Sequence, residues 1–173
     1  MNETTYDRHG DMEKVKDLRD VLPVHRTKKP STRKASKIKR IIVHCSDWNI
    51  TPEALAAYDI GPNHISSTGC PTATYHYNVD RAGTAFHAVD DLKVTWHAGG
   101  HNSDTIAIGL LYKTDPVFES GKKKTAPDEF LPTDIMIEAT VDLIAELCLK
   151  YKIPPNKVLG HRELAGTGFI FLK

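Results

Sequence analysis

Two histidines stand at the ends of short apolar runs, and they are the residues of this chain best placed to do chemistry. Residues 41–43 (Ile-Ile-Val) precede His44, and residues 158–160 (Val-Leu-Gly) precede His161. Each run predicts a buried strand that delivers an imidazole at its carboxyl end, where α/β sheets place their functional groups. A further histidine, His97, follows a tryptophan between the two. Imidazole is a preferred zinc ligand, so this pattern predicts a metal site assembled across a sheet.

Length and composition predict one soluble domain with an extension. The chain has 173 residues, of which 40% are hydrophobic and 26% are charged, as in ordinary globular proteins. No apolar run approaches the roughly 18–20 residues that a membrane span needs. The first five residues are polar and lack the apolar core of a signal peptide. We therefore expect no membrane span, and synthesis in the cytoplasm without a signal peptide.

The three cysteines predict a reducing compartment rather than a disulfide scaffold, because an odd and sparse set cannot pair completely. Cys148 is expected in the core of a helix. Cys45 follows His44 on a strand, so its side chain should point to the opposite face. Cys70 precedes a proline in a loop and stays open as a metal ligand.

The first 37 residues are predicted to be an N-terminal extension and basic linker. Met12, Val15 and Leu22 could line one side of a short helix that ends at Pro23. Residues 26–40 carry eight Lys or Arg and no acidic residue. A solvated linker is the preferred interpretation, and attraction to an anionic surface such as a wall polymer, lipid or nucleic acid is the alternative.

The compact domain is predicted to begin at Ile38 and to have an α/β fold, because strands and helices alternate around one sheet. The long helix starts at the cap Thr133 and should bury Ile137, Val141, Ile144, Leu147 and Cys148. A shorter helix should begin at Thr51-Pro52-Glu53. The predicted strands are 41–45, 73–79, 84–87, 106–112 and 157–160, with a hairpin turn at 80–83.

Five segments occur in an order that resembles a known family. They are Val43-His44-Cys45-Ser46, Gly69-Cys70-Pro71 ahead of Tyr75-His76-Tyr77, Asp80-Arg81-Ala82-Gly83, Trp96-His97-Ala98-Gly99 and Leu159-Gly160-His161-Arg162-Glu163. Over about residues 38–168 the chain resembles the zinc-dependent N-acetylmuramoyl-L-alanine amidases, the type 2 amidase and peptidoglycan-recognition group that includes many phage lysins. The resemblance implies a single mixed central β-sheet flanked by helices.

The resemblance also implies a reaction and roles for four residues. His44 and His161 would bind one Zn²⁺ together with a third ligand, usually cysteine or aspartate. Zinc with an open position lowers the pKa of its water toward about 7. The reaction is hydrolysis of the amide between N-acetylmuramic acid and L-alanine in peptidoglycan. Tyr75 would be catalytic, by hydrogen-bonding the water or the developing oxyanion, and His97 would contact the substrate.

The sequence departs from the family pattern in two places. Gly109 stands where some amidases carry a glutamate in the strand 106–111. The family's Lys-Xaa-Cys-Pro segment, which supplies the third ligand, does not follow His161. We therefore expect the domain, residues 38–173, to be incomplete at its C-terminus. The alternative is that the third ligand is lost or replaced, and Cys70 is then the substitute to exclude within the chain.

Three hypotheses about function follow. The first is a bacteriolytic, endolysin-like amidase of phage origin that acts on the cell wall, released by lysis or carried on a virion. The second is a non-catalytic peptidoglycan-binding module of the same fold. The third is a virion or adaptor protein that uses the basic N-terminal segment. Peptidoglycan or a muropeptide is the expected partner, and nucleic acid is not.

Overall fold

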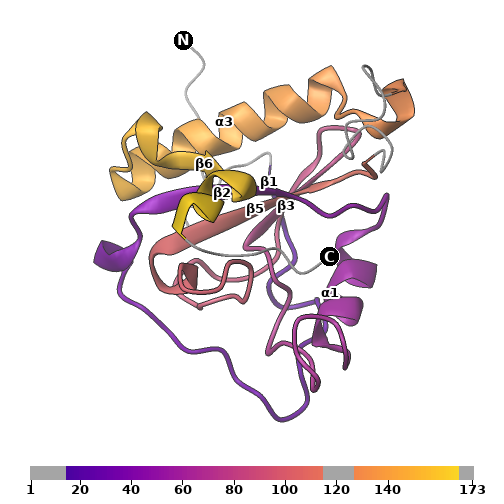
Figure 1. Cartoon of the computed structure of the whole chain (residues 1–173), viewed down its shortest axis with the longest axis vertical. Coiled ribbons are helices and arrows are strands. Elements are labelled where there is room, and N and C mark those ends of the chain that lie inside the picture. The colour runs from indigo at the N-terminus through magenta and orange to yellow at the C-terminus, as the bar shows by residue number, and fades with distance from the viewer. Residues whose placement is uncertain (1–14, 115–126, 168–173) are drawn as a thin grey trace.

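A mixed β-sheet forms the centre of the molecule, as predicted (Figure 1). The computed structural model describes residues 15–114 and 127–167. Within them, six strands lie in the order β1-β4-β3-β5-β2-β6, with β3 and β4 antiparallel and the other neighbouring pairs parallel. The strands are β1 (Val15–Asp17), β2 (Arg40–Cys45), β3 (Tyr77–Asp80), β4 (Ala85–His87), β5 (Thr105–Leu111) and β6 (Val158–Gly160).

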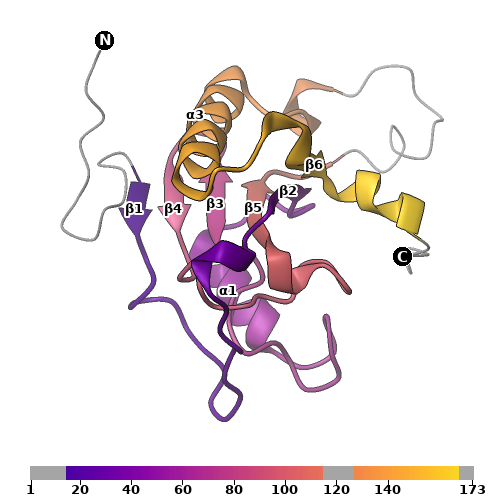
Figure 2. The same cartoon turned by 90° about the vertical axis from the view of Figure 1, so that its left-hand side faces the viewer.

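Two α-helices lie on opposite sides of the sheet. Figure 2 shows α3 (Asp134–Tyr151) above the row of strands and α1 (Pro52–Ile60) below it. No helix in the described ranges is long and apolar enough to cross a membrane. Short 3₁₀ helices occupy Ala35–Lys37, Asn102–Asp104, Asp128–Phe130, Pro155–Lys157 and His161–Thr167.

Alternation along β2 divides its side chains between the two faces of the sheet. Ile41 packs in the main core, which the strands share with α3. Ile42 belongs instead to a small cluster with Ala98 and Leu164 on the other face. His44, two residues after Ile42, therefore lies on the face away from α3. The strand register thus places the histidine on the side of α1.

Both predicted helix starts are confirmed by their caps. The hydroxyl of Thr51 accepts a hydrogen bond from the backbone N–H of Ala54, and a proline follows it in the first turn. The hydroxyl of Thr133 accepts one from Met136 in the same way. Each side chain satisfies a backbone donor that the helix itself leaves without a partner.

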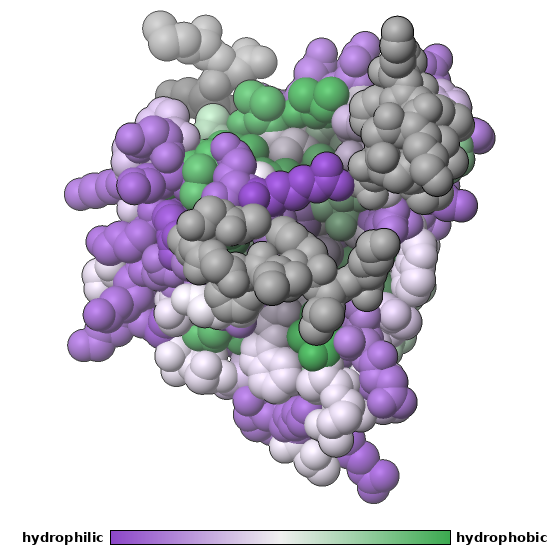
Figure 3. Space-filling view, in the orientation of Figure 1, coloured by the Kyte–Doolittle hydropathy of each residue, from purple (hydrophilic) through white to green (hydrophobic). Residues whose placement is uncertain are grey.

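The buried face of α3 differs from the prediction. Met136, Thr140, Leu143 and Leu147 are buried, whereas Ile137 and Val141 are exposed. Apolar residues occur around most of this helix, so their spacing alone does not define its buried face. Thr140 can be buried because its hydroxyl donates to the carbonyl of Met136 at 2.7 Å. In Figure 3, apolar side chains are visible along the upper edge, where Figure 1 places α3.

The described part of the segment before residue 38 packs against the sheet, whereas a solvated linker was predicted. Val15 lies in an edge strand, β1, paired in parallel with β4, so the predicted short helix through Val15 and Leu22 is wrong. Leu22 is buried in a cluster with Ala73 and Val89. Met12 lies outside the described residues. The apolar positions of this segment therefore cover the edge of the sheet.

The predicted hairpin is confirmed, but its first strand is shorter than expected. Gly83 has φ of 77° and donates its N–H to the carbonyl of Asp80, which closes the turn between β3 and β4. Strand β3 begins at Tyr77, and the N–H of Thr74, inside the predicted strand, bonds to a side chain rather than to a neighbouring strand. Thr74 donates its N–H to the side chain of Asp59 at 2.8 Å.

The orientation of α3 predicts that truncating Leu143 destabilises the protein, whereas truncating the nearby Val141 hardly does. Leu143→Ala should lower the free energy of unfolding by about 2–5 kcal/mol, because it leaves a cavity in the core. Val141→Ala should change it by no more than about 0.5 kcal/mol, because that side chain is 57% exposed. Urea titration of both variants measures the difference. Equal losses would contradict this orientation of the helix.

Candidate active site

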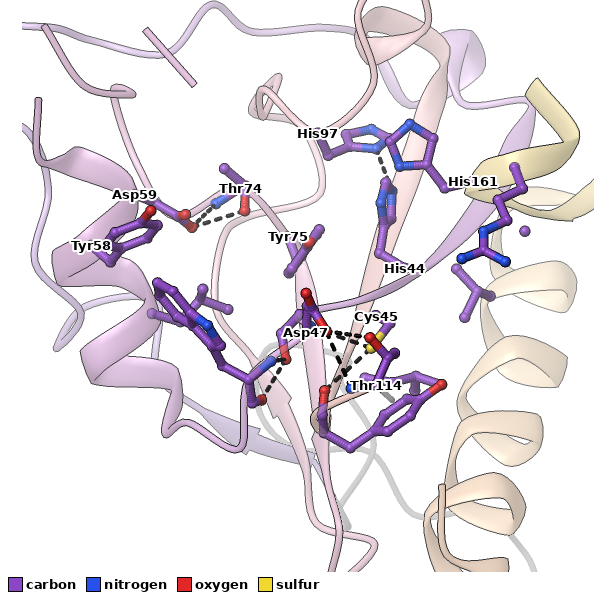
Figure 4. A pocket seen from close by; sticks show the side chains of 18 of the residues that line it. His44, Cys45, Asp47, Tyr58, Asp59, Thr74, Tyr75, His97, Thr114 and His161 are labelled. Carbon is purple, nitrogen blue, oxygen red and sulfur yellow. Dashed lines mark hydrogen bonds between the residues drawn. The ribbon is translucent and has the colours of Figure 1, made fainter. Parts of the chain in front are cut away.

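A pocket of about 1070 Å³ opens at the carboxyl ends of β2, β5 and β6 and extends to α1. Figure 4 shows His44, His97 and His161 pointing toward one another, with Tyr75 beside them. All four residues line the pocket. The structure thus brings together the four residues singled out from the sequence, although they come from four separate segments of the chain.

The pairing of β2 with β6 places His44 beside His161. In this parallel pair Ile41 lies opposite Val158, and Val43 lies opposite Gly160. One further step in the same register brings the two histidines side by side. Their ring centroids are 4.5 Å apart, close to the spacing between neighbouring strands.

Gly109 makes room for Tyr75 on the other side of His44. Gly109 is the register partner of His44 on β5. A Cβ atom at this position would lie 2.1 Å from Cδ2 of Tyr75, so the aromatic ring occupies the space of the missing side chain. The ring centroids of Tyr75 and His44 are 4.9 Å apart. Tyr75 can therefore take this position only because residue 109 has no side chain.

His97 belongs to a hydrogen-bond chain that determines which nitrogen of His44 is free. The hydroxyl of Thr105 donates to the carbonyl of His101, so it can only accept from Nε2 of His97, 2.8 Å away. Nδ1 of His97 then carries a lone pair, which accepts from Nε2 of His44 at 2.9 Å. His44 therefore keeps an unprotonated Nδ1. Asn102 supports this arrangement, since its side-chain oxygen accepts from the N–H groups of His97 and Ala98.

The imidazoles are neutral at neutral pH. Burial, with a further contribution from His161, lowers the pKa of His44 to about 3. Burial also lowers the pKa of His97 well below its ordinary value and lowers the pKa of His161. Burial and the nearby Asp59 raise the pKa of the Tyr75 phenol, which stays protonated. The pocket therefore presents imidazole lone pairs beside the protonated hydroxyl of Tyr75.

Arg33 supports the segment that carries His97, and sequence reasoning missed it. Its guanidinium donates to the carbonyls of Asp91, Asn102 and Thr105 at 2.7–3.0 Å. Within residues 26–40 it looked like one more solvated cation. The short hydrophilic stretch around it gave no sign that the charge would be buried, because its acceptors are backbone carbonyls distant in sequence.

Asp59 is a second supporting residue that the sequence did not indicate. One of its carboxylate oxygens accepts from both the N–H and the hydroxyl of Thr74, each at 2.8 Å. Burial raises the pKa of Asp59 to about 6, against the opposing effect of these hydrogen bonds. Because Thr74 precedes Tyr75, this contact ties the catalytic candidate to α1.

Two other histidines lie in the interior, away from the pocket. His76 and His87 are both fully buried and do not line it. His76 accepts the N–H of Ala107 at its Nδ1 and lies 3.0 Å from the carbonyl of Lys93 through its Nε2. His64, in contrast, lines the pocket.

The donor set fits part of a zinc site. His44 and His161 are neutral and adjacent, as zinc ligands must be. Within residues 15–114 and 127–167, however, no group of three His, Cys, Asp or Glu side chains could hold a metal ion. Cys70 is fully buried away from the pocket, and burial raises the pKa of its thiol to about 11, which does not support the alternative of a substitute ligand there. Cys45 lines the pocket, but its thiol donates to the carbonyl of Tyr112.

Comparison with known proteins gives the family. The N-acetylmuramoyl-L-alanine amidase model matches residues 34–168, and the chain belongs to this family. A probable N-acetylmuramoyl-L-alanine amidase of Bacillus licheniformis is 24% identical over 157 residues. That match covers 89% of this chain and 42% of the relative, so the chain spans less than half the length of this curated relative.

Solved structures share the fold. The N-acetylmuramoyl-L-alanine amidase LysC from Clostridium intestinale aligns with a TM-score of 0.55 at 19% identity, covering 81% of this chain and 82% of that one. An ectodomain complex of the peptidoglycan recognition proteins LCa and LCx, bound to tracheal cytotoxin, aligns with a TM-score of 0.63 at 17% identity. That alignment covers 87% and 86% of the two chains. The fold is therefore that of the amidases and peptidoglycan recognition proteins.

The contact between Gly109 and Tyr75 predicts that Gly109→Ala destabilises the protein by about 1–3 kcal/mol, because the added methyl group collides with the ring. Gly160→Ala is a matched control at the pocket edge. There the nearest atom to a new Cβ is Oε2 of the Glu163 side chain, at 3.3 Å, which can move aside. Denaturant titration measures both.

A double variant separates the collision from other effects of the alanine. In a Tyr75→Ala background, the cost of Gly109→Ala should largely disappear, because the ring is gone. An unchanged cost would show that Tyr75 does not occupy the space above Gly109.

Proposed function

We propose that this chain hydrolyses the amide bond between N-acetylmuramic acid and L-alanine in peptidoglycan, as a zinc-dependent, endolysin-like amidase of phage origin. The main observation behind the proposal is that neutral His44 and His161 lie side by side, with ring centroids 4.5 Å apart, next to a protonated Tyr75. In this proposal the protein acts on the cell wall, which it reaches when the cell lyses or as part of a virion.

In this proposal His44 and His161 hold the zinc ion, with Nδ1 of His44 as the free nitrogen. When bound, zinc supplies Lewis acidity and lowers the pKa of water. His97 keeps the ring of His44 in place through their hydrogen bond, and its position beside the site also suits a contact with the substrate. The third protein ligand is not among the described residues.

Tyr75 acts on the carbonyl of the scissile amide. As water adds to the carbonyl carbon, negative charge develops on the oxygen, and a phenol that stays protonated can donate a hydrogen bond to it. The proposal therefore assigns the stabilisation of this negative charge to the hydroxyl of Tyr75.

A binding-only function is the second candidate. The absence of a third metal ligand among residues 15–114 and 127–167 favours it. In that case the same pocket would hold a muropeptide without cleaving it. The basic-segment hypothesis has weaker support, because Arg33 and Lys28 bond to backbone carbonyls and Arg40 pairs with Asp104.

Purified peptidoglycan distinguishes the two candidates. The amidase should release new L-alanine amino groups, lose this activity on treatment with a chelator and regain it with zinc. His44→Ala and His161→Ala should each abolish turnover and lower zinc affinity at least about tenfold, whereas Leu149→Ala, at an exposed position outside the pocket, should do neither. Elemental analysis and amine labelling measure the two effects. Sedimentation of the chain with intact peptidoglycan, without new amines, would identify a binding module.

Tyr75→Phe tests the role of the hydroxyl while the ring stays in place above Gly109. The variant should lower kcat by about 10²–10³ and leave zinc content and unfolding free energy unchanged. Steady-state kinetics on a soluble muropeptide measures it. Wild-type turnover by a folded, zinc-loaded variant would remove Tyr75 from the mechanism.

A further inference from the structure

Three rings from separate segments meet at the α1 end of the pocket. Trp48 follows β2, Tyr58 lies on α1 and His64 lies in the loop after α1. The ring centroids of Trp48 and Tyr58 are 4.7 Å apart, and those of Tyr58 and His64 are 4.3 Å apart. We call these three residues the aromatic wall. All three line the pocket.

The aromatic wall is exposed although its rings are large. Trp48 is 43% exposed and Tyr58 is 40% exposed. Neither ring is part of the three buried apolar clusters, so packing of the core does not account for them. Exposed aromatic side chains grouped within a pocket are typical of a binding surface.

Two contacts order parts of the wall: a local one at the backbone of Trp48, and one between His64 and α1. The hydroxyl of Ser46 donates to the carbonyl of Trp48 at 2.7 Å and accepts the N–H of the same residue. Nε2 of His64 lies 3.5 Å from the buried carboxylate of Asp59. A surface ordered in this way loses little conformational entropy when a ligand packs on it.

The charge of the pocket differs between its two ends. Arg162 is the only Lys or Arg among the described residues that line it. Its neighbour in sequence, His161, lies at the end away from α1 (Figure 4). The end with the aromatic wall carries acidic residues, Asp47 and Asp59. An anionic ligand group would be repelled there, whereas a neutral ring with apolar C–H faces and hydroxyl groups would not.

We propose that the aromatic wall binds a pyranose ring of the glycan strand, with the sugar packed on Trp48 and Tyr58 next to the scissile amide. The inference rests on the proposed function, because it places the N-acetylmuramic acid side of the substrate at the α1 end. The apolar face of a pyranose packs on an aromatic ring, and its hydroxyl groups suit acidic and imidazole acceptors. The stem peptide, with its carboxylates, then extends toward Arg162.

Two substrates that differ only in the sugar test this inference with the full chain. One is an N-acetylmuramoyl peptide, and the other is the D-lactoyl peptide, which contains the same amide without the pyranose. Trp48→Leu and Tyr58→Leu should each lower kcat/KM for the sugar-containing substrate about three- to tenfold and leave the lactoyl peptide unaffected. Trp48→Phe, which keeps a ring, should recover part of the loss. Leu149→Ala, a 78% exposed apolar position outside the pocket, is the matched control and should change neither rate.

A binding measurement separates this inference from the amidase proposal. The disaccharide of N-acetylglucosamine and N-acetylmuramic acid is titrated into the wild type and the leucine variants, followed by NMR chemical shifts. If the chain cleaves nothing but binds the disaccharide, and Trp48→Leu weakens that binding, the amidase proposal fails and the wall still binds sugar. Equal losses on both substrates, or no disaccharide binding by the wild type, would overturn the inference.

Discussion

The site depends on burying several polar rings together without charging them. His44 and His97 each lose most of their contact with water, and burial makes the charged imidazolium costly, so both stay neutral. When two neutral imidazoles are hydrogen-bonded to each other, one must donate its N–H and the other must accept it. The hydrogen bonds of Thr105 determine that His97 accepts and His44 donates. The lone pair left on His44 is therefore a consequence of hydrogen bonding in the surrounding loop.

The register of the parallel strands determines how the side chains of the site are arranged. Three adjacent parallel strands, β6, β2 and β5, end at the same edge, so His161, His44 and Gly109 lie in a row. Strand spacing sets the separation of the imidazoles, and the missing side chain in the row admits the ring of Tyr75. A side chain at residue 109 and Tyr75 in its present position exclude each other sterically. The absence of a side chain at residue 109 thus permits close contact between a phenol and an imidazole.

The sequence predicted what depends on local signals. Apolar runs ending in histidine located β2 and β6, and threonine caps located α1 and α3. The buried face of α3 could not be predicted, because Thr140 enters the core only after its hydroxyl has bonded within the helix. Arg33 and Asp59 were missed for a related reason. Their partners are backbone carbonyls and a threonine that come close only in the folded chain. Residue type and spacing in the sequence therefore do not indicate these contacts.

Arg33 also shows that residues before the family match contribute to the folded domain. The family match starts at residue 34, one residue after the guanidinium that binds three carbonyls around the His97 segment. This partly buried guanidinium cannot be removed without leaving those carbonyls short of donors, which costs more than the loss of a fully exposed contact. β1 adds an edge strand to the same sheet, and Lys28 reaches the carbonyl of Gly69 in the loop ahead of Tyr75. We infer that residues 15–37 stabilise the site although the family pattern does not include most of them, because the loops that present His97 and Tyr75 are bonded to this segment.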